Sequence, residues 1–246
     1  MIAIKIGDFL FRHAFFLYNF IYPRFKRRQD RYEIDLIKKI LKPGDTVLDI
    51  GANIGFYTSF FSALVGKSGK VHCFEPDRLN FQRLKKNTSA LDNITLHEAA
   101  ASNLNGTITL FQSDLLNVDH KTYRTTESES GYSVPSLKLD DLFTNTKIHL
   151  IKIDIQGFEY FAFEGLKQTL ARNPELKILT EFYPYGIRNS GATLTAFFEL
   201  FWENGFQAYQ IQDDSLVLLK PADLSKFEKL DQGTYFNLLI TSEMLG

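Results

Sequence analysis

Two neighbouring apolar segments of the chain each end in residues suited to binding a nucleoside. Residues 45–61 read DTVLDIGANIGFYTSFF. An apolar segment ends at Ile50, and it is followed by Gly51, Asn53 and Gly55. A short strand, a glycine turn and a helix form the layout of a nucleotide-binding βα unit. We expect Gly51 and Gly55 to leave room for a ligand, because glycine has no Cβ and tolerates positive φ.

The spacing of this turn indicates which nucleoside binds. Asn53 stands where a dinucleotide-binding turn has its second glycine, which lets the main chain touch a pyrophosphate. A cofactor with an amino-acid tail can instead use both the turn and the amide, and S-adenosylmethionine fits that description. We also assign Asp49 to the cofactor site, together with Tyr57, which either flanks the methionine tail or simply packs.

A carboxylate follows the next apolar segment. KVHCFEP places Glu75 at the carboxyl end of the second expected strand, where an acid can accept hydrogen bonds from both ribose hydroxyls. The alternative is that Glu75 only caps the helix expected to begin near Asp77. Small residues at the end of the third strand, among them Ala100, offer space for the adenine.

The candidate catalytic residues are two acids and one histidine. Asp154 ends the apolar segment HLIKID, and ionised carboxylates are rarely placed there unless they are paired or functional. It could be a base, orient an acceptor hydroxyl, face the sulfonium, hold a metal or cap a loop. Glu181, at the end of KILTEFYP, could face the same crevice, and His120 is a further candidate base. No set of ligands with metal-binding spacing is visible, so we predict no metal.

Four segments together resemble a known family. VLDIGANIGFYT, KVHCFEPDRLNFQRLKKN, the LDDL segment and IKIDIQGFE are similar to successive motifs of the FkbM-type S-adenosylmethionine-dependent methyltransferases, over residues 40–241. The resemblance implies the α/β class I methyltransferase fold, a Rossmann-like, seven-stranded, mostly parallel sheet with helices on both faces and an antiparallel C-terminal strand. It also implies O-methylation of a hydroxyl on a sugar, glycan or natural-product acceptor. The chain departs from the family pattern at Gln156, where an acid is usual.

The order of the expected elements supports that fold. Strands and helices alternate along the chain, and such alternation builds a mostly parallel sheet. Strands are expected near 46–50, 70–75, 94–98, 148–154, 176–182, 206–212 and 235–241, and helices near 55–65, 77–90, 158–171 and 193–203.

We expect one domain, residues 44–246, preceded by an aromatic and basic helical arm, residues 1–43. Within the domain, residues 112–136 are expected to form an inserted polar loop that contributes to the acceptor pocket or is a surface loop only.

Charge is segregated between the two parts. The arm carries a net charge of +6 and the remainder −7, for a total of −1. The arm could cover the cofactor side of the domain, pair with a second subunit in a homodimer, or lie on an anionic membrane surface through residues 9–28.

The overall balance argues against general nucleic-acid binding, which needs a concentrated basic face. The single Cys73 excludes an intrachain disulfide and indicates a reducing compartment, so we expect a cytoplasmic protein, with the inner face of the membrane as the alternative site. Two other functions compete with methyl transfer: an NAD-dependent oxidoreductase on a Rossmann-like fold, and a non-catalytic protein that binds S-adenosylmethionine or serves as a scaffold.

Overall fold

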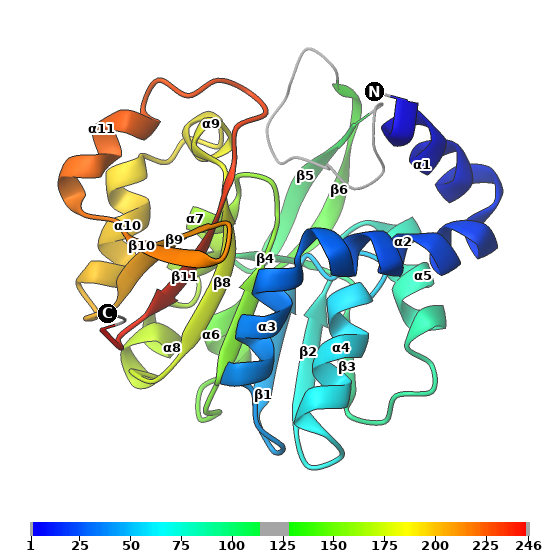
Figure 1. Ribbon diagram of the computed structural model, residues 1–246, viewed down its shortest axis with the longest axis horizontal. Coiled ribbons are helices and arrows are strands. Elements are labelled where there is room, and N and C mark those ends of the chain that lie inside the picture. The colour runs from blue at the N-terminus through cyan, green and yellow to red at the C-terminus, as the bar shows by residue number, and fades with distance from the viewer. Residues whose placement is uncertain (1, 114–127, 245–246) are drawn as a thin grey trace.

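The chain folds around one large sheet. The computed structural model describes residues 2–113 and 128–244 of the chain. Eight strands form the large sheet in the order β10-β9-β11-β8-β7-β1-β2-β3, and three form a small sheet in the order β4-β6-β5 (Figure 1). The strands are β1 (Thr46–Ile50), β2 (Lys70–Phe74), β3 (Ile94–His97), β4 (Ala100–Ser102), β5 (Gly106–Ser113), β6 (Ser128–Lys138), β7 (Leu150–Ile153), β8 (Lys177–Phe182), β9 (Gln207–Gln212), β10 (Ser215–Leu218) and β11 (Phe236–Thr241).

Helices cover both faces of the large sheet (Figure 1). Alternate residues of β1 point to opposite faces: Val47 packs with α3 and α4, while Leu48 packs in the cluster that contains α7, α8 and α10. The helices are α1 (Ile2–His13), α2 (Phe15–Gln29), α3 (Arg31–Ile40), α4 (Phe56–Val65), α5 (Arg78–Asn87), α6 (Leu139–Leu142), α7 (Glu159–Glu164), α8 (Lys167–Arg172), α9 (Pro184–Asn189), α10 (Leu194–Trp202) and α11 (Leu224–Phe227), with a 3₁₀ turn, η1 (Pro221–Asp223).

The sheet contains one strand more than the seven predicted. β10 pairs antiparallel with β9 across a tight turn at Asp213, whose φ is +50°. The turn residues, Asp213 and Asp214, include no glycine, so the hairpin left no strong signal in the sequence. The predicted antiparallel end of the sheet is present, with β11 between β8 and β9.

Two other predicted boundaries differ from the structure. The helix expected over 158–171 is divided into α7 and α8, because the Asp140 carboxylate accepts the backbone N–H groups of Gln168 and Thr169 and so begins a new helix. The polar loop expected over 112–136 is shorter, since β6 already begins at Ser128. The remainder of that loop, residues 114–127, lies outside the described residues.

The arm residues form α1, α2 and α3, and the first two pack on the turn that follows β1. Phe11 and Tyr18 form a buried cluster with Ile54 of that turn. The guanidinium of Arg83 on α5 lies 3.8 Å from the centre of the Phe11 ring and donates a 2.9 Å hydrogen bond to the Phe11 carbonyl. No helix within the described ranges is long and apolar enough to cross a membrane.

Candidate active site at the carboxyl ends of the central strands

The predicted glycine turn lies between the ends of β1 and β2. The backbone N–H of Gly51 donates to the Phe74 carbonyl over 2.9 Å, and that of Ala52 donates to the same oxygen over 3.1 Å. Gly51 and Gly55 have φ of +79° and +89°, and Asn53 has φ of +51°. The backbone reversal that the sequence predicted is therefore present.

The two glycines are needed for packing within the protein. A Cβ on Gly51 would lie 2.1 Å from the Asp154 carbonyl oxygen. A Cβ on Gly55 would lie 2.8 Å from Leu84 of α5. These close contacts involve the chain itself, whereas the glycines were predicted from the sequence to leave room for a ligand. The contact of Gly51, Asn53 and Gly55 with the cofactor stays a prediction.

Gly51→Ala is expected to destabilise the fold by at least about 3 kcal/mol, because it combines a strained φ with a backbone clash. The matched control is Gly205→Ala, since Gly205 also has a positive φ, +80°, but has nothing within 4 Å of an added Cβ. That control should lose only about 1–2 kcal/mol, the cost of the left-handed conformation alone. Urea unfolding of both variants measures the difference, and equal losses would show that the contact between Gly51 and Asp154 is unimportant.

Glu75 lies directly after β2 and is linked to the glycine turn. Its Oε2 accepts the Asn53 N–H over 2.8 Å, and its Oε1 accepts the Asp77 N–H over 2.9 Å. The side chain is buried, and burial raises the pKa of this carboxyl to about 8, although the two N–H donors act in the opposite direction. Each oxygen retains a lone pair, so the carboxylate can still accept from ribose hydroxyls.

Two further predicted cofactor residues are buried around this turn. Asp49 on β1 accepts a 2.5 Å hydrogen bond from Thr58, and burial raises its pKa to about 6. The Tyr57 hydroxyl lies within hydrogen-bonding distance of Asp30, at 2.6 Å, and of Glu33, at 3.0 Å. Tyr57 therefore joins α4 to the arm, the packing role that the sequence left open, and its contact with a cofactor stays a prediction.

Asp154 and Glu181 are brought together by one amide. Gln156 Nε2 donates to Asp154 Oδ1 over 3.1 Å and to Glu181 Oε2 over 2.9 Å. Lys152 Nζ lies 3.8 Å from Asp154 Oδ2. Burial and the neighbouring Asp154 raise the pKa of Glu181 well above its ordinary value. The structure thus places both predicted acids at the ends of adjacent strands, β7 and β8, and the Asp154 backbone lies beside Gly51.

Three residues of this cluster had no role predicted from the sequence. Lys152 is buried in β7, Gln156 holds φ of +55°, and Glu159 accepts the N–H groups of Ile155 and Gly157 through Oε1. A lysine inside an apolar strand was a detectable signal, because such a charge is buried only when it is paired. The bridging role of Gln156 depends on the spatial proximity of two strand ends and had no local signal.

The remaining predicted site residues lie elsewhere or outside the described ranges. Ala100 is buried on β4 and packs with Leu110 and Val134 of the small sheet. Its contact with adenine stays a prediction. His120 belongs to residues 114–127, so the structure does not describe it.

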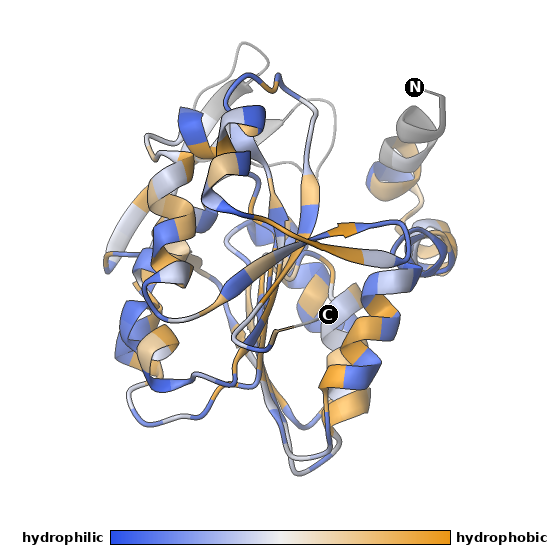
Figure 2. Cartoon of the chain, turned by 60° about the vertical axis from the view of Figure 1, so that its left-hand side comes forward, coloured by the Kyte–Doolittle hydropathy of each residue, from blue (hydrophilic) through white to orange (hydrophobic). Residues whose placement is uncertain are grey.

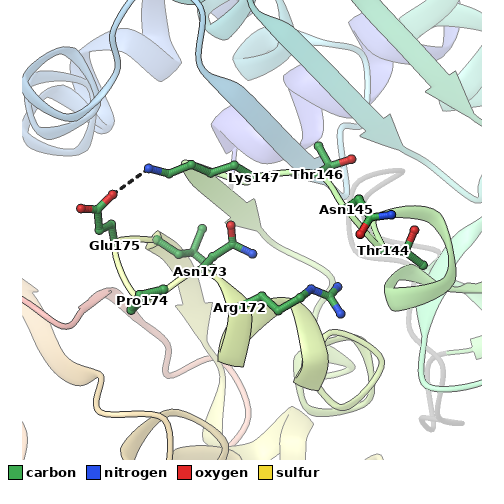
Figure 3. Close-up of a pocket in the computed structure, with 9 residues that line it drawn as sticks. Thr144, Asn145, Thr146, Lys147, Arg172, Asn173, Pro174 and Glu175 are labelled. Atoms are coloured by element: carbon green, nitrogen blue, oxygen red, sulfur yellow. Dashed lines mark hydrogen bonds and ion pairs between the residues drawn. The ribbon is translucent and has the colours of Figure 1, made fainter.

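Within the described part of the chain, no three His, Cys, Asp or Glu side chains are grouped so that they could hold a metal ion. A pocket of about 460 Å³ lies at the opposite edge of the sheet, before β7 and β8 (Figure 3). It is lined by Thr144–Lys147 side chains and by Arg172, Asn173, Pro174, Glu175 and Leu176, with Lys147 paired to Glu175 over 2.7 Å. None of the predicted site residues lines it.

Sequence comparison identifies the family. The Methyltransferase FkbM domain matches residues 49–214, which include the glycine turn, Glu75, Asp154 and Glu181. The chain belongs to the FkbM methyltransferase family. A relative named 2-O-methyltransferase NoeI, from Sinorhizobium fredii (strain NBRC 101917 / NGR234), is 31% identical over 155 residues. That alignment covers 56% of this chain and spans 63% of the length of the relative.

Solved structures show the same fold. An rRNA methylase from Streptococcus thermophilus aligns with a TM-score of 0.51 at 14% identity, over 85% of this chain and 93% of that chain. A Streptococcus mutans protein solved in complex with S-adenosylhomocysteine aligns with a TM-score of 0.50 at 13% identity, over 85% and 94%. The predicted FkbM family and class I methyltransferase fold are confirmed, S-adenosylmethionine is the cofactor of the FkbM domain, and the NAD alternative is not favoured.

Proposed function

We propose that this FkbM domain transfers the methyl group of S-adenosylmethionine to a hydroxyl on a sugar, glycan or natural-product acceptor. Asp154 carries the proposal, since it directly follows β7 and its backbone carbonyl lies beside Gly51 of the glycine turn. The relative named 2-O-methyltransferase supports oxygen as the methylated atom.

The residues of the site fit this reaction. Bound S-adenosylmethionine supplies a methyl group on a sulfonium, which needs little further activation. Glu75 would hold the ribose hydroxyls, and Asp154 would accept the proton of the acceptor hydroxyl. Positive φ at Gly51 and Asn53 shapes the turn beside them. General-base catalysis of this kind accelerates a reaction by about 10²–10⁴-fold.

Gln156 and Glu181 would position that base. The Gln156 amide holds Asp154 Oδ1 at 3.1 Å and Glu181 Oε2 at 2.9 Å, so it fixes the rotamer of Asp154. The raised pKa of Glu181 favours its neutral form, which limits repulsion between the two acids.

The finer features of the acceptor site are part of the proposal. The segment between β5 and β6 would complete the acceptor pocket, with His120 as a further candidate base. Homodimer formation and peripheral contact with a membrane through residues 9–28 also stay proposals. Membrane contact would suit a glycan acceptor that is anchored to lipid.

The test is an assay of the purified chain with S-adenosylmethionine and a panel of free sugars and glycans. We expect one acceptor class to gain the mass of a methylene group, and the Asp154→Asn variant to lose that product while it still binds S-adenosylhomocysteine by calorimetry. Binding of NAD without binding of either adenosyl compound would contradict the proposal. Methylation of nitrogen in place of oxygen, located by fragmentation of the product, would contradict its chemistry.

A further inference from the structure

The outward side of α2 is apolar although it lies in solvent. Thirteen large hydrophobic side chains are exposed among the described residues, and six of them lie within residues 9–25. Phe16 is 84% exposed and Phe25 is 63% exposed. We call five of the six the outer face of the arm: Phe16, Leu17, Phe20, Ile21 and Phe25. Such a concentration of exposed apolar groups marks an interaction surface.

The outer face is separate from the contacts that hold the arm on the domain. Those contacts come from the other side of the helices, where Phe11 and Tyr18 are buried with Ile54. On the same side the ring centres of Tyr22 and Phe56 are 6.2 Å apart. The arm is therefore anchored without its outer face. In Figure 2 the helix next to the N-terminus, α1, stands at the edge of the domain.

Arginines extend the outer face toward the C-terminus of α2. Arg24, Arg27 and Arg28 are exposed, and intervals of three, four and seven residues place them on the same side of the helix as Phe20 and Ile21. The Arg24 guanidinium lies 3.9 Å above the Phe20 ring. Aromatic rings bordered by arginines are complementary to a bilayer surface, where the rings enter the acyl boundary and the guanidinium groups meet anionic headgroups.

We propose that the outer face of the arm docks the protein on a bilayer that contains anionic lipid. A second copy of this chain is the less favourable occupant, because it would bring like-charged arginines together. α2 also covers the glycine turn, so docking would bring the cofactor side of the sheet close to the lipid headgroups. The inference rests on the arm alone and holds whether or not the proposed methyl transfer is correct.

Sedimentation of the full chain with vesicles tests the proposal. Vesicles of phosphatidylcholine alone are compared with equal mixtures of phosphatidylcholine and phosphatidylglycerol, at low and high salt. We expect binding to the anionic vesicles that weakens with salt. Arg27→Glu with Arg28→Glu should lower the affinity by at least about 25-fold, about fivefold for each arginine. Phe16→Ser with Phe20→Ser should lower it on the same vesicles by removing the inserted rings.

Matched controls lie on other surfaces of the domain. Lys67→Glu with Lys70→Glu reverses two exposed charges at the opposite edge of the sheet, and Leu104→Ser with Leu142→Ser removes two exposed apolar groups. Both should bind anionic vesicles as the parent does. Equal losses in the controls, or no vesicle binding by the parent, would overturn the proposal. The proposal would also be overturned if the parent were a dimer in sedimentation velocity and the double variant Phe16→Ser with Phe20→Ser were a monomer. A second copy of the chain would then cover the outer face. Circular dichroism confirms that each variant is folded.

Discussion

Replacing Asp154 with asparagine is expected to lower turnover by about 10²–10⁴-fold, the usual contribution of a general base. The amide cannot accept the proton of the acceptor hydroxyl. Its oxygen can still take the hydrogen bond from Gln156, which lies 3.1 Å from Asp154 Oδ1. Binding of S-adenosylhomocysteine should therefore change by only a few-fold. Stopped assays of methyl transfer measure the first quantity, and calorimetry measures the second.

The control for this prediction is Asp141→Asn, which changes an exposed carboxylate on α6. It should leave both turnover and binding unchanged. If Asp154→Asn retains full turnover, Asp154 has a structural role only.

Replacing Glu75 with glutamine is expected to weaken S-adenosylhomocysteine binding by about 10–100-fold, in line with the loss of a charge-assisted hydrogen bond. Glutamine is a better test than alanine. An alanine would leave the Asn53 and Asp77 N–H groups without their acceptor, since both donate to Glu75 in the folded chain. Calorimetric titration measures the affinity, and thermal unfolding measures any loss of stability.

Glu159→Gln is the matched control, because Glu159 is also buried and also accepts two backbone N–H groups of a turn. Glu75→Gln should lose more stability, because the two N–H groups at Glu75 use both carboxylate oxygens and an amide has only one acceptor oxygen, whereas both N–H groups at Glu159 donate to Oε1. Glu159→Gln should keep cofactor affinity within a few-fold. If the two variants lose the same affinity, Glu75 acts only by holding its turn and the ribose assignment is wrong.

The pH dependence of binding follows from the same carboxyl. Burial raises its pKa from 4.5 to about 8 in the free protein, whereas ribose hydroxyls donate to the ionised form and favour it. Binding should therefore release a proton below pH 8, and affinity should fall by up to about tenfold per pH unit as the pH decreases. Glu75→Gln should abolish that dependence. The raised pKa also means that the stability contributed by the neutral form is full below pH 4.5 and is lost as the pH rises toward 8.

The sequence alone determined the family and most of the sheet. Short apolar segments located the strands of the large sheet other than β10, and the glycine turn with Glu75 after the next strand indicated a nucleoside site. These features are local, since a short apolar strand and a turn with positive φ are encoded within a few neighbouring residues. β10 escaped prediction because its turn has no glycine.

The tertiary structure decided which residues meet. Gln156 joins Asp154 to Glu181 only because β7 and β8 are adjacent and parallel. Gly51 is required by the Asp154 carbonyl, and Tyr57 contacts the arm through Asp30 and Glu33. The division of the arm into a packed side and an exposed side was likewise invisible in the sequence, because aromatic residues occur on both sides of the helix. Such contacts depend on burial and on distances between segments far apart in the chain, which a one-dimensional pattern does not contain.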